Sequence, residues 1–243
     1  MSELYDSIRL THLAAAFTSA LGVDAPEGAE SPCDIVLDRL FAEFGEGGAD
    51  RVFIYNPDAV ALWLFQKYTE LFKDAISRTQ IQLPILSVMP SVTPVCFASM
   101  YSGVMPEVHG IMRYEKPVLK IKTVFDALAA AGKRCAIVST EGDSISKIFL
   151  ERDIDYYIYP SVEECNEKAL ELIASDEHDF ITLYNGDYDG TMHRNAPEGK
   201  QSIEALKANI AVFSQIYDAI KEKWSGHRTL LGFCPDHGCH EID

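Results

Sequence analysis

Blocks of hydrophobic and polar positions along the chain predict an α/β protein. Runs that are apolar throughout are typical of buried parallel strands, and they lie at 51–56, 81–89, 134–139, 156–159, 179–184 and 229–234. Segments with helical spacing lie between these runs, at 59–76, 94–102, 123–131, 145–150, 161–174 and 202–224. Alternating strands and helices indicate a three-layer α/β/α sandwich with a largely parallel central sheet.

The first fifty residues follow a different pattern. Two helical stretches, 3–22 and 35–44, are separated by a loop rich in Gly, Pro and Glu. We expect residues 1–50 to form a helical lead-in that packs on the sheet. No repeat, low-complexity tract or linker divides the remainder, so the sequence predicts a single domain over 1–243.

The composition limits the classes of partner. Hydrophobic residues make up 47% and charged residues 24%, as in ordinary soluble globular proteins. The formal net charge of −16 argues against a nucleic-acid polymer or an anionic membrane as partner, because both require a basic surface. A small anionic substrate stays compatible with this charge if metal ions supply local positive charge.

The location is predicted from what the sequence lacks. No apolar run approaches the ~20 residues of a membrane span, and the N-terminus has no hydrophobic signal segment. The six scattered cysteines have no CxxC spacing and are predicted to be reduced thiols. We therefore expect a cytoplasmic protein, and the sequence does not indicate its oligomeric state.

Thr93 follows the second predicted strand and precedes Pro94. A residue before proline is pushed toward extended geometry, and proline suits the first turn of a helix. We therefore expect a helix from Pro94 to about Ser102, ended by Gly103. Thr93 either caps this helix or presents its hydroxyl to a phosphate in the positive field of the helix N-terminus.

Acidic and imidazole side chains follow three further strands. These residues are Asp58, then Asp187, Asp189 and His193, and finally Asp236, His237 and His240. The C-terminal ends of parallel strands lie at one edge of a sheet, where such side chains are suitable ligands for zinc or manganese. Singly, each has a simpler interpretation as a helix cap, a turn residue or a surface histidine. Their coincidence at strand ends favours a metal site.

The order of these motifs resembles the alkaline phosphatase superfamily, especially its type I phosphodiesterase and nucleotide pyrophosphatase branch. The resemblance covers roughly 51–240 and any one motif is weak alone. The matching elements are Asp58, Thr93-Pro94, Ser102-Gly103, Pro106, His109-Gly110-Ile111, Asp189-Gly-Thr-Met-His193 with Ala196-Pro197, and Asp236-His237-Gly238.

The resemblance implies an alkaline phosphatase-like fold and two divalent ions, Zn²⁺ or alternatively Mn²⁺. Asp58, Thr93, Asp236 and His237 would hold one ion, and Asp189 and His193 the other. The implied activity is hydrolysis of a small phosphorylated substrate, as a phosphodiesterase or phosphatase, through a phospho-threonine at Thr93. The alternatives are a phosphoryl or phosphoethanolamine transferase, a mutase, or a degenerate member that only binds a ligand. His109 would be structural.

Two substitutions depart from the superfamily pattern near the nucleophile. Ala59 follows Asp58 where glycine is usual. Cys96 stands where the phosphodiesterase branch often has a phosphate-binding asparagine, and Ser91, Asn185 or a backbone N–H are the candidates to replace it. The loops 113–122 and 194–201 are the candidates for substrate specificity.

The last metal ligand is a third departure. The superfamily usually supplies another histidine well after Asp-His-Gly, and this chain stops at Asp243. Either His240 completes the second metal site, or the sequence is C-terminally truncated relative to the family core. We favour the second interpretation.

Overall fold

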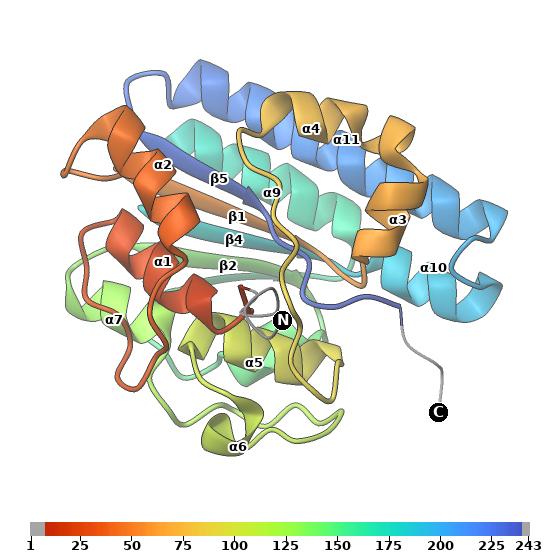
Figure 1. The fold of residues 1–243 in the computed structure, drawn as a ribbon, viewed down its shortest axis with the longest axis horizontal. Helices are drawn as coiled ribbons and strands as arrows, with labels where there is room; N and C mark the ends of the chain where they lie inside the picture. Colours follow the sequence, from red (N-terminus) through yellow and green to blue (C-terminus); the bar gives the residue numbers. More distant parts are fainter. Residues whose placement is uncertain (1–7, 240–243) are drawn as a thin grey trace, which may run out of the picture.

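A central sheet of five parallel strands organises the protein (Figure 1). The computed structural model describes residues 8–239. Within this range the strand order is β3-β2-β4-β1-β5. The strands are β1 (Arg51–Pro57), β2 (Cys135–Thr140), β3 (Asp155–Tyr159), β4 (Phe180–Asn185) and β5 (Thr229–Phe233). All five lie within or next to predicted strand runs.

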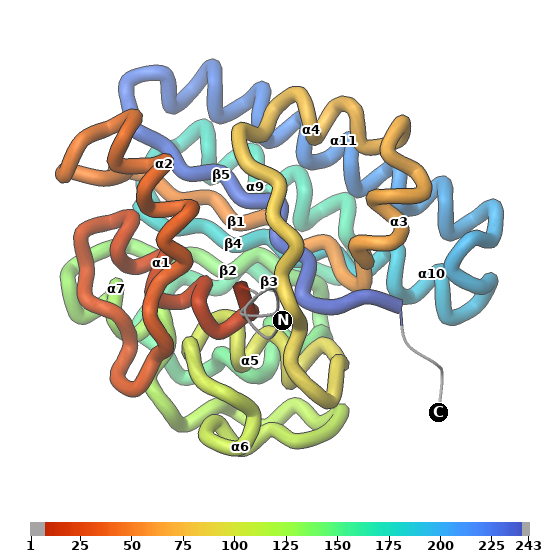
Figure 2. The backbone as a smooth tube through the Cα atoms, viewed as in Figure 1, coloured from red at the N-terminus to blue at the C-terminus, as the bar shows by residue number. Residues whose placement is uncertain are grey.

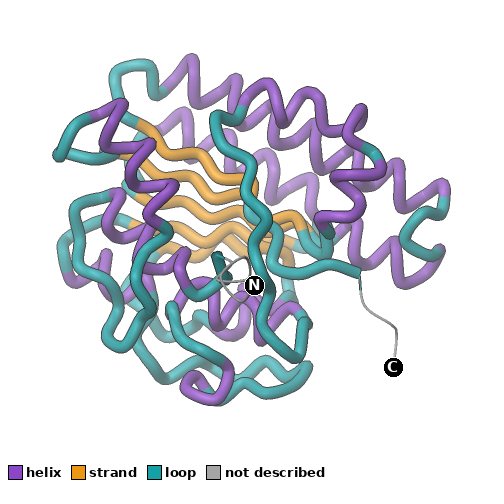
Figure 3. The backbone as a smooth tube through the Cα atoms, in the orientation of Figure 1, coloured by secondary structure: helices purple, strands orange, loops and turns teal. Residues whose placement is uncertain are grey.

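Helices cover both faces of the sheet (Figure 3). One face packs against α1 (His12–Ala20), α2 (Asp34–Phe44), α5 (Thr93–Ser102), α7 (Val124–Ala130) and α8 (Ser144–Ile148). The other packs against α3 (Leu62–Lys67), α4 (Lys73–Arg78), α9 (Val162–Ser175), α10 (Asp187–Asn195) and α11 (Lys200–Lys223). The predicted three-layer α/β/α sandwich is confirmed.

Successive side chains of β1 point to opposite faces of the sheet and so contribute to both helical layers. Val52 and Ile54 belong to the core under α1 and α5, whereas Phe53 and Tyr55 belong to the core under α11. All four side chains are fully buried. A strand that is covered on both faces places successive side chains in two apolar layers, so residues 52–55 do not alternate between apolar and polar.

The predicted strand at 81–89 is wrong. The segment from 79 to 92 lies outside the sheet and makes one isolated parallel bridge, between Arg9 and Leu86. Leu86 is 46% exposed and Met89 is 74% exposed, whereas Val88 is buried in the core, so the apolar run is only partly buried. In Figure 2 this yellow segment runs from α4 to α5 across the view. With β5 it lines a groove of about 1100 Å³ that also touches Asp236 and His237.

Several helix predictions need correction. The helix expected over 59–76 begins only at Leu62, after Ala59 with its left-handed φ of 59°. It ends first at Tyr68, whose φ of −113° and ψ of 34° are not helical, so the segment is divided into α3, a 3₁₀ turn (Thr69–Phe72) and α4. Asp187 and the Asp189-Gly190 pair, for which turn positions were an alternative, lie in a helix, α10. A short helix, α6 (Pro106–His109), was not predicted. Part of the expected 3–22 helix lies outside the described residues, and α1 begins at His12.

No helix within residues 8–239 is long and apolar enough to cross a membrane.

Gly103 ends α5 in a tightly packed left-handed conformation. Its φ is 79°, and a Cβ atom built there would lie 2.5 Å from the Cβ of Ala29 and 3.1 Å from that of Ala14. Both the backbone and the packing therefore require glycine in the Ser102-Gly103 pair.

We predict that Gly103→Ala lowers the free energy of unfolding by about 2–4 kcal/mol, the sum of left-handed strain and overpacking. Gly132→Ala is the matched control, because Gly132 has a φ of 75° but no atom within 4 Å of the added Cβ. It should lose only about 1 kcal/mol. Equal losses in urea denaturation would contradict the packing argument.

Candidate active and metal-binding site

Thr93 is the first residue of α5, and its hydroxyl points to the strand ends. Thr93 Oγ1 lies 3.3 Å from Asp58 Oδ2 and 3.2 Å from His237 Nε2. Val92, in extended geometry, occupies the N-cap position, where Thr93 was the predicted candidate. Among the described residues, the hydroxyl is bonded only to these two side chains. Helix capping is therefore not what its geometry indicates.

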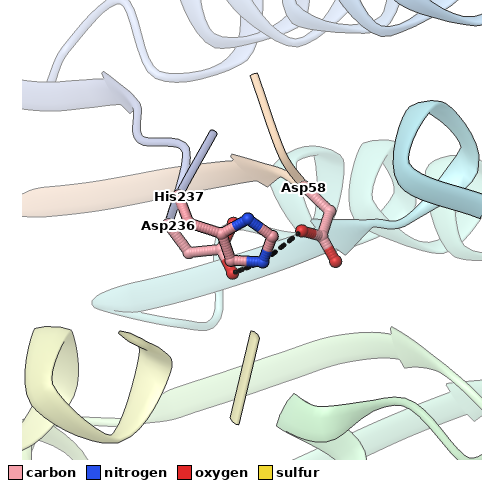
Figure 4. A group of neighbouring side chains, drawn as sticks. All are labelled: Asp58, Asp236 and His237. Carbon is pink, nitrogen blue, oxygen red and sulfur yellow. Dashed lines mark ion pairs between the residues drawn. The ribbon is translucent and has the colours of Figure 1, made fainter. Parts of the chain in front are cut away.

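Asp58 and Asp236 follow the neighbouring strands β1 and β5, and His237 lies beside them (Figure 4). His237 Nε2 lies 3.2 Å from Asp58 Oδ1 and 3.3 Å from Asp236 Oδ2. One ligand atom from each residue lies within 4.8 Å of the other two. The side chains are buried, with residue exposures of 1%, 1% and 4%. The parallel register of β1 and β5 brings these positions together.

The tautomer of His237 follows from its second nitrogen. Nδ1 lies 2.7 Å from the carbonyl oxygen of Gly238, which can only accept, so Nδ1 carries the hydrogen. In the neutral ring, Nε2 then presents a lone pair toward Thr93 and the two carboxylates. Histidine metal ligands commonly have this arrangement, with the non-ligating N–H fixed by a carbonyl.

The electrostatics of the pair fit a bound cation. Burial, followed by the charge of Asp236, raises the pKa of Asp58 well above its usual range, and burial raises the pKa of Asp236 to about 7. Within the described chain, Asp58 Oδ1 and Asp236 Oδ2 are buried without hydrogen-bond partners. Two adjacent buried carboxylates disfavour double ionisation unless a positive charge joins them. Oxygen and nitrogen donors in this set suit Zn²⁺ or Mn²⁺.

Local geometry also explains two small residues in the motifs. A Cβ atom on Gly238 would lie 2.9 Å from the Cβ of Ala61, so the Asp-His-Gly turn packs too closely for a larger residue. Ala59 occupies a left-handed conformation that glycine adopts more easily. The backbone N–H of Ala59 still reaches Asp236 Oδ1 at 3.4 Å, so Asp58 keeps its place beside Asp236.

Asp189 and His193 form a second acidic and imidazole pair. His193 Nε2 lies 3.2 Å from Asp189 Oδ1, one turn apart on α10. The charge of Asp189 contributes to the raised pKa values of Asp58 and Asp236, so it acts on the same site. The three-residue ligand group does not include this pair.

Asp187 and His109 are not part of the three-residue ligand group. The Asp187 side chain is exposed. His240 lies outside the described residues. His109 Nε2 lies 3.0 Å from Ser99 Oγ, its Nδ1 accepts the N–H of Ile111, and burial lowers its pKa to about 4, which fits a neutral structural histidine.

The sequence did not reveal three polar residues near the site. Tyr184, on β4, donates its hydroxyl hydrogen to Asp58 Oδ2. Ser87 Oγ donates to the carbonyl oxygen of Asp236 at 3.1 Å and lies 3.2 Å from Cys96 Sγ. Asp143, at the C-terminal end of β2, has a pKa raised to about 6, chiefly by burial. Tyr184 and Ser87 lie in apolar runs, whereas Asp143 lies at a strand end and could have been found by the same rule as Asp58.

Comparison with solved structures confirms the expected fold. Phosphonoacetate hydrolase from Sinorhizobium meliloti 1021, in complex with phosphonoformate, is 17% identical with a TM-score of 0.54, over 70% of this chain and 53% of its own. Murine ectonucleotide pyrophosphatase/phosphodiesterase 5, as an inactive variant in complex with AMP, is 16% identical with a TM-score of 0.62, over 78% of this chain and 57% of its own. The chain has an alkaline phosphatase-like fold.

The chain thus spans somewhat more than half the length of these two structures. No family model matches the sequence, and no curated protein matches it. The similarity is therefore one of fold.

We predict that Asp236→Asn stabilises the metal-free protein at pH 8 by about 1–3 kcal/mol while weakening metal binding. The folded-state pKa of Asp236, about 7, lies above the ordinary value of 3.8. The folded state therefore binds more protons between these values, and stability falls as the pH rises from about 4 to 7. Asparagine removes this loss. The measurement is chemical denaturation in chelator at pH 5 and pH 8, where the gain should be largest at pH 8.

Asp50→Asn is the control of opposite sign, because Arg228 lowers the pKa of Asp50 to about 2. This variant should lose stability at pH 8. A destabilising effect of Asp236→Asn in chelator would contradict the conclusion that the Asp58 and Asp236 pair is strained without a cation.

Proposed function

We propose that the protein is a metal-dependent hydrolase of small phosphate esters, a phosphodiesterase or phosphatase, with Thr93 as nucleophile. One observation carries the proposal. The Thr93 hydroxyl lies at the N-terminus of α5, within 3.3 Å of Asp58 and His237. Together with Asp236, these two residues place their ligand atoms close enough to one another to bind one metal ion. The proposed nucleophile, Thr93, therefore lies next to the proposed proton acceptor, Asp58, and to the proposed metal ligands.

The residues of the chain can carry out the first transfer as follows. Thr93 Oγ1 gives its proton to Asp58 Oδ2 and forms a bond to phosphorus, while the ester P–O bond breaks. The leaving alcohol keeps the bonding electrons and takes a proton from water. The hydroxide left by that water then attacks the phospho-threonine, the Thr93 Oγ1–P bond breaks to release phosphate, and Asp58 returns its proton to Thr93 Oγ1. The positive end of α5 stabilises the negative phosphoryl oxygens throughout.

The metal ligands divide into two sets. Asp58, Asp236 and His237, with Thr93, would hold one divalent ion, and Asp189 with His193 would contribute to a second. When bound, such ions lower the pKa of the attacking hydroxyl and offset negative charge on the phosphoryl group. We favour Zn²⁺ for this donor set, with Mn²⁺ as the alternative.

The structural neighbours support this class of substrate. One binds AMP and the other binds phosphonoformate, both small and phosphorus-containing. The AMP complex was formed by an inactive threonine-to-alanine variant, which agrees with a catalytic role for a threonine in this fold. The net charge of −16 also favours a small substrate that reaches bound metal over an extended polyanion.

We predict that the protein hydrolyses bis-p-nitrophenyl phosphate, p-nitrophenyl phosphate or both once loaded with Zn²⁺ or Mn²⁺. Thr93→Ala should lower kcat by about a thousandfold or more, because the nucleophilic oxygen is lost. Thr93→Ser keeps a hydroxyl and should retain far more activity. Release of p-nitrophenolate measures both rates.

Thr18→Ala is the matched control for loss of a buried threonine, since Thr18 is fully buried in α1. Its activity should equal that of the wild type. The proposal fails if the loaded protein is inert toward both esters, or if Thr93→Ala is as active as the wild type.

A further inference from the structure

Asn56 is the centre of a fully buried polar network beneath the candidate site. Its Oδ1 accepts hydrogen bonds from Tyr101 Oη at 2.6 Å and from Thr182 Oγ1 at 2.8 Å. Its Nδ2 donates to the carbonyl oxygen of Cys234 at 2.7 Å and lies 3.6 Å from Met100 Sδ. One side chain therefore joins β1, β4, α5 and the segment that follows β5.

The four joined segments carry Asp58, Tyr184, Thr93 and Asp236 of the candidate site. Asn56, Thr182 and Cys234 each lie two positions before a residue of the site. On α5, Tyr101 lies about two helical turns after Thr93. Side chains two apart on a strand point to the same face. The pairs are Asn56 with Asp58, Thr182 with Tyr184, and Cys234 with Asp236.

The chemistry of the network suits an amide at its centre. Tyr101 and Thr182 offer hydroxyl groups to an acceptor, whereas the Cys234 carbonyl needs a donor, and an uncharged side-chain amide meets both needs with an acceptor oxygen and a donor nitrogen on separate atoms. Asn56, Tyr101 and Thr182 each have no solvent exposure. Hydrogen bonds in such an interior are strong and directional, and an orphaned partner is unfavourable, so the network fixes the relative placement of the four segments.

We propose that Asn56 is a positioning residue, which holds Thr93, Asp58 and Asp236 at their mutual distances through Tyr101, Thr182 and Cys234. It touches neither substrate nor metal. The expected effect of Asn56 on metal affinity rests on the proposed function. Its role in holding the segment after β5, residues 234–239, does not. A merely structural network would stabilise the fold without changing the local order of the site.

The test uses Asn56→Leu and the milder Thr182→Val, with Thr18→Val as matched control. Thr18 and Thr182 are both fully buried, and the Thr18 hydroxyl bonds only to carbonyls of α1 among the described residues. Thr182→Val keeps the side-chain shape, so it should fold even if Asn56→Leu does not.

The first measurement is amide hydrogen exchange of the metal-free proteins over residues 234–239. We expect exchange there to be at least several-fold faster in Thr182→Val and Asn56→Leu than in Thr18→Val, after correction for global stability. The second is titration with Zn²⁺ or Mn²⁺ alone. We expect affinity about tenfold weaker in the network variants, as for other residues that orient metal ligands, and no change in Thr18→Val.

Unchanged exchange over 234–239 relative to Thr18→Val overturns the positioning role. Unchanged metal affinity, in a protein whose wild type binds metal, overturns it as well. If the wild type binds neither ion, the proposed function fails, and the exchange measurement still decides whether Asn56 anchors the segment.

Discussion

Two carboxylates, Asp58 and Asp236, are buried side by side, with His237 Nε2 within 3.3 Å of both. In an interior of low dielectric, this arrangement is unfavourable unless a proton or a cation lies between the charges. The raised pKa values of both residues express that cost in the metal-free protein. Most features of the site follow from it, because the surrounding structure must hold the pair together against repulsion and desolvation.

The parallel sheet provides that restraint. β1 and β5 are paired in register, so the residues that follow them leave the sheet side by side. The hydroxyl of Tyr184, on the other neighbour of β1, bonds to Asp58, and α5 packs across the same face to bring Thr93 to the group. Each contact joins chain segments that are far apart in sequence. The strain of the site is therefore balanced by the packing of the whole sheet, as is common at functional sites.

Much of this arrangement could be predicted from the sequence. Apolar runs identified all five strands, and the rule that parallel strands end at one edge was enough to group Asp58, Asp236 and His237. Thr93 was expected beside them for a wrong reason, because the strand placed before it does not form, and it reaches the group as the first residue of α5. The failed strand at 81–89 had the right composition, but composition alone does not show whether an apolar run is buried in a sheet or lies on its rim. The turn-forming residues of 185–190 similarly hid α10, which packs against α11 through Tyr188 and Met192.

The roles of Tyr184 and Asn56 could not be predicted from the sequence, for a different physical reason. Both lie inside strands that are buried on both faces, where no period distinguishes a polar group with partners from its apolar neighbours. Their roles depend on the pairing of β1 with β4 and on the position of α5 against the sheet, and both join segments that are far apart in the sequence.

The most direct test of the account is a crystal structure of the protein soaked with Zn²⁺ or Mn²⁺ and phosphate, with anomalous diffraction to locate the metal. We predict an anomalous peak bounded by Asp58, Asp236 and His237, with a phosphate oxygen or the Thr93 hydroxyl completing its shell. A peak at other residues, or a metal at this group with Thr93 turned away from it, would contradict the account.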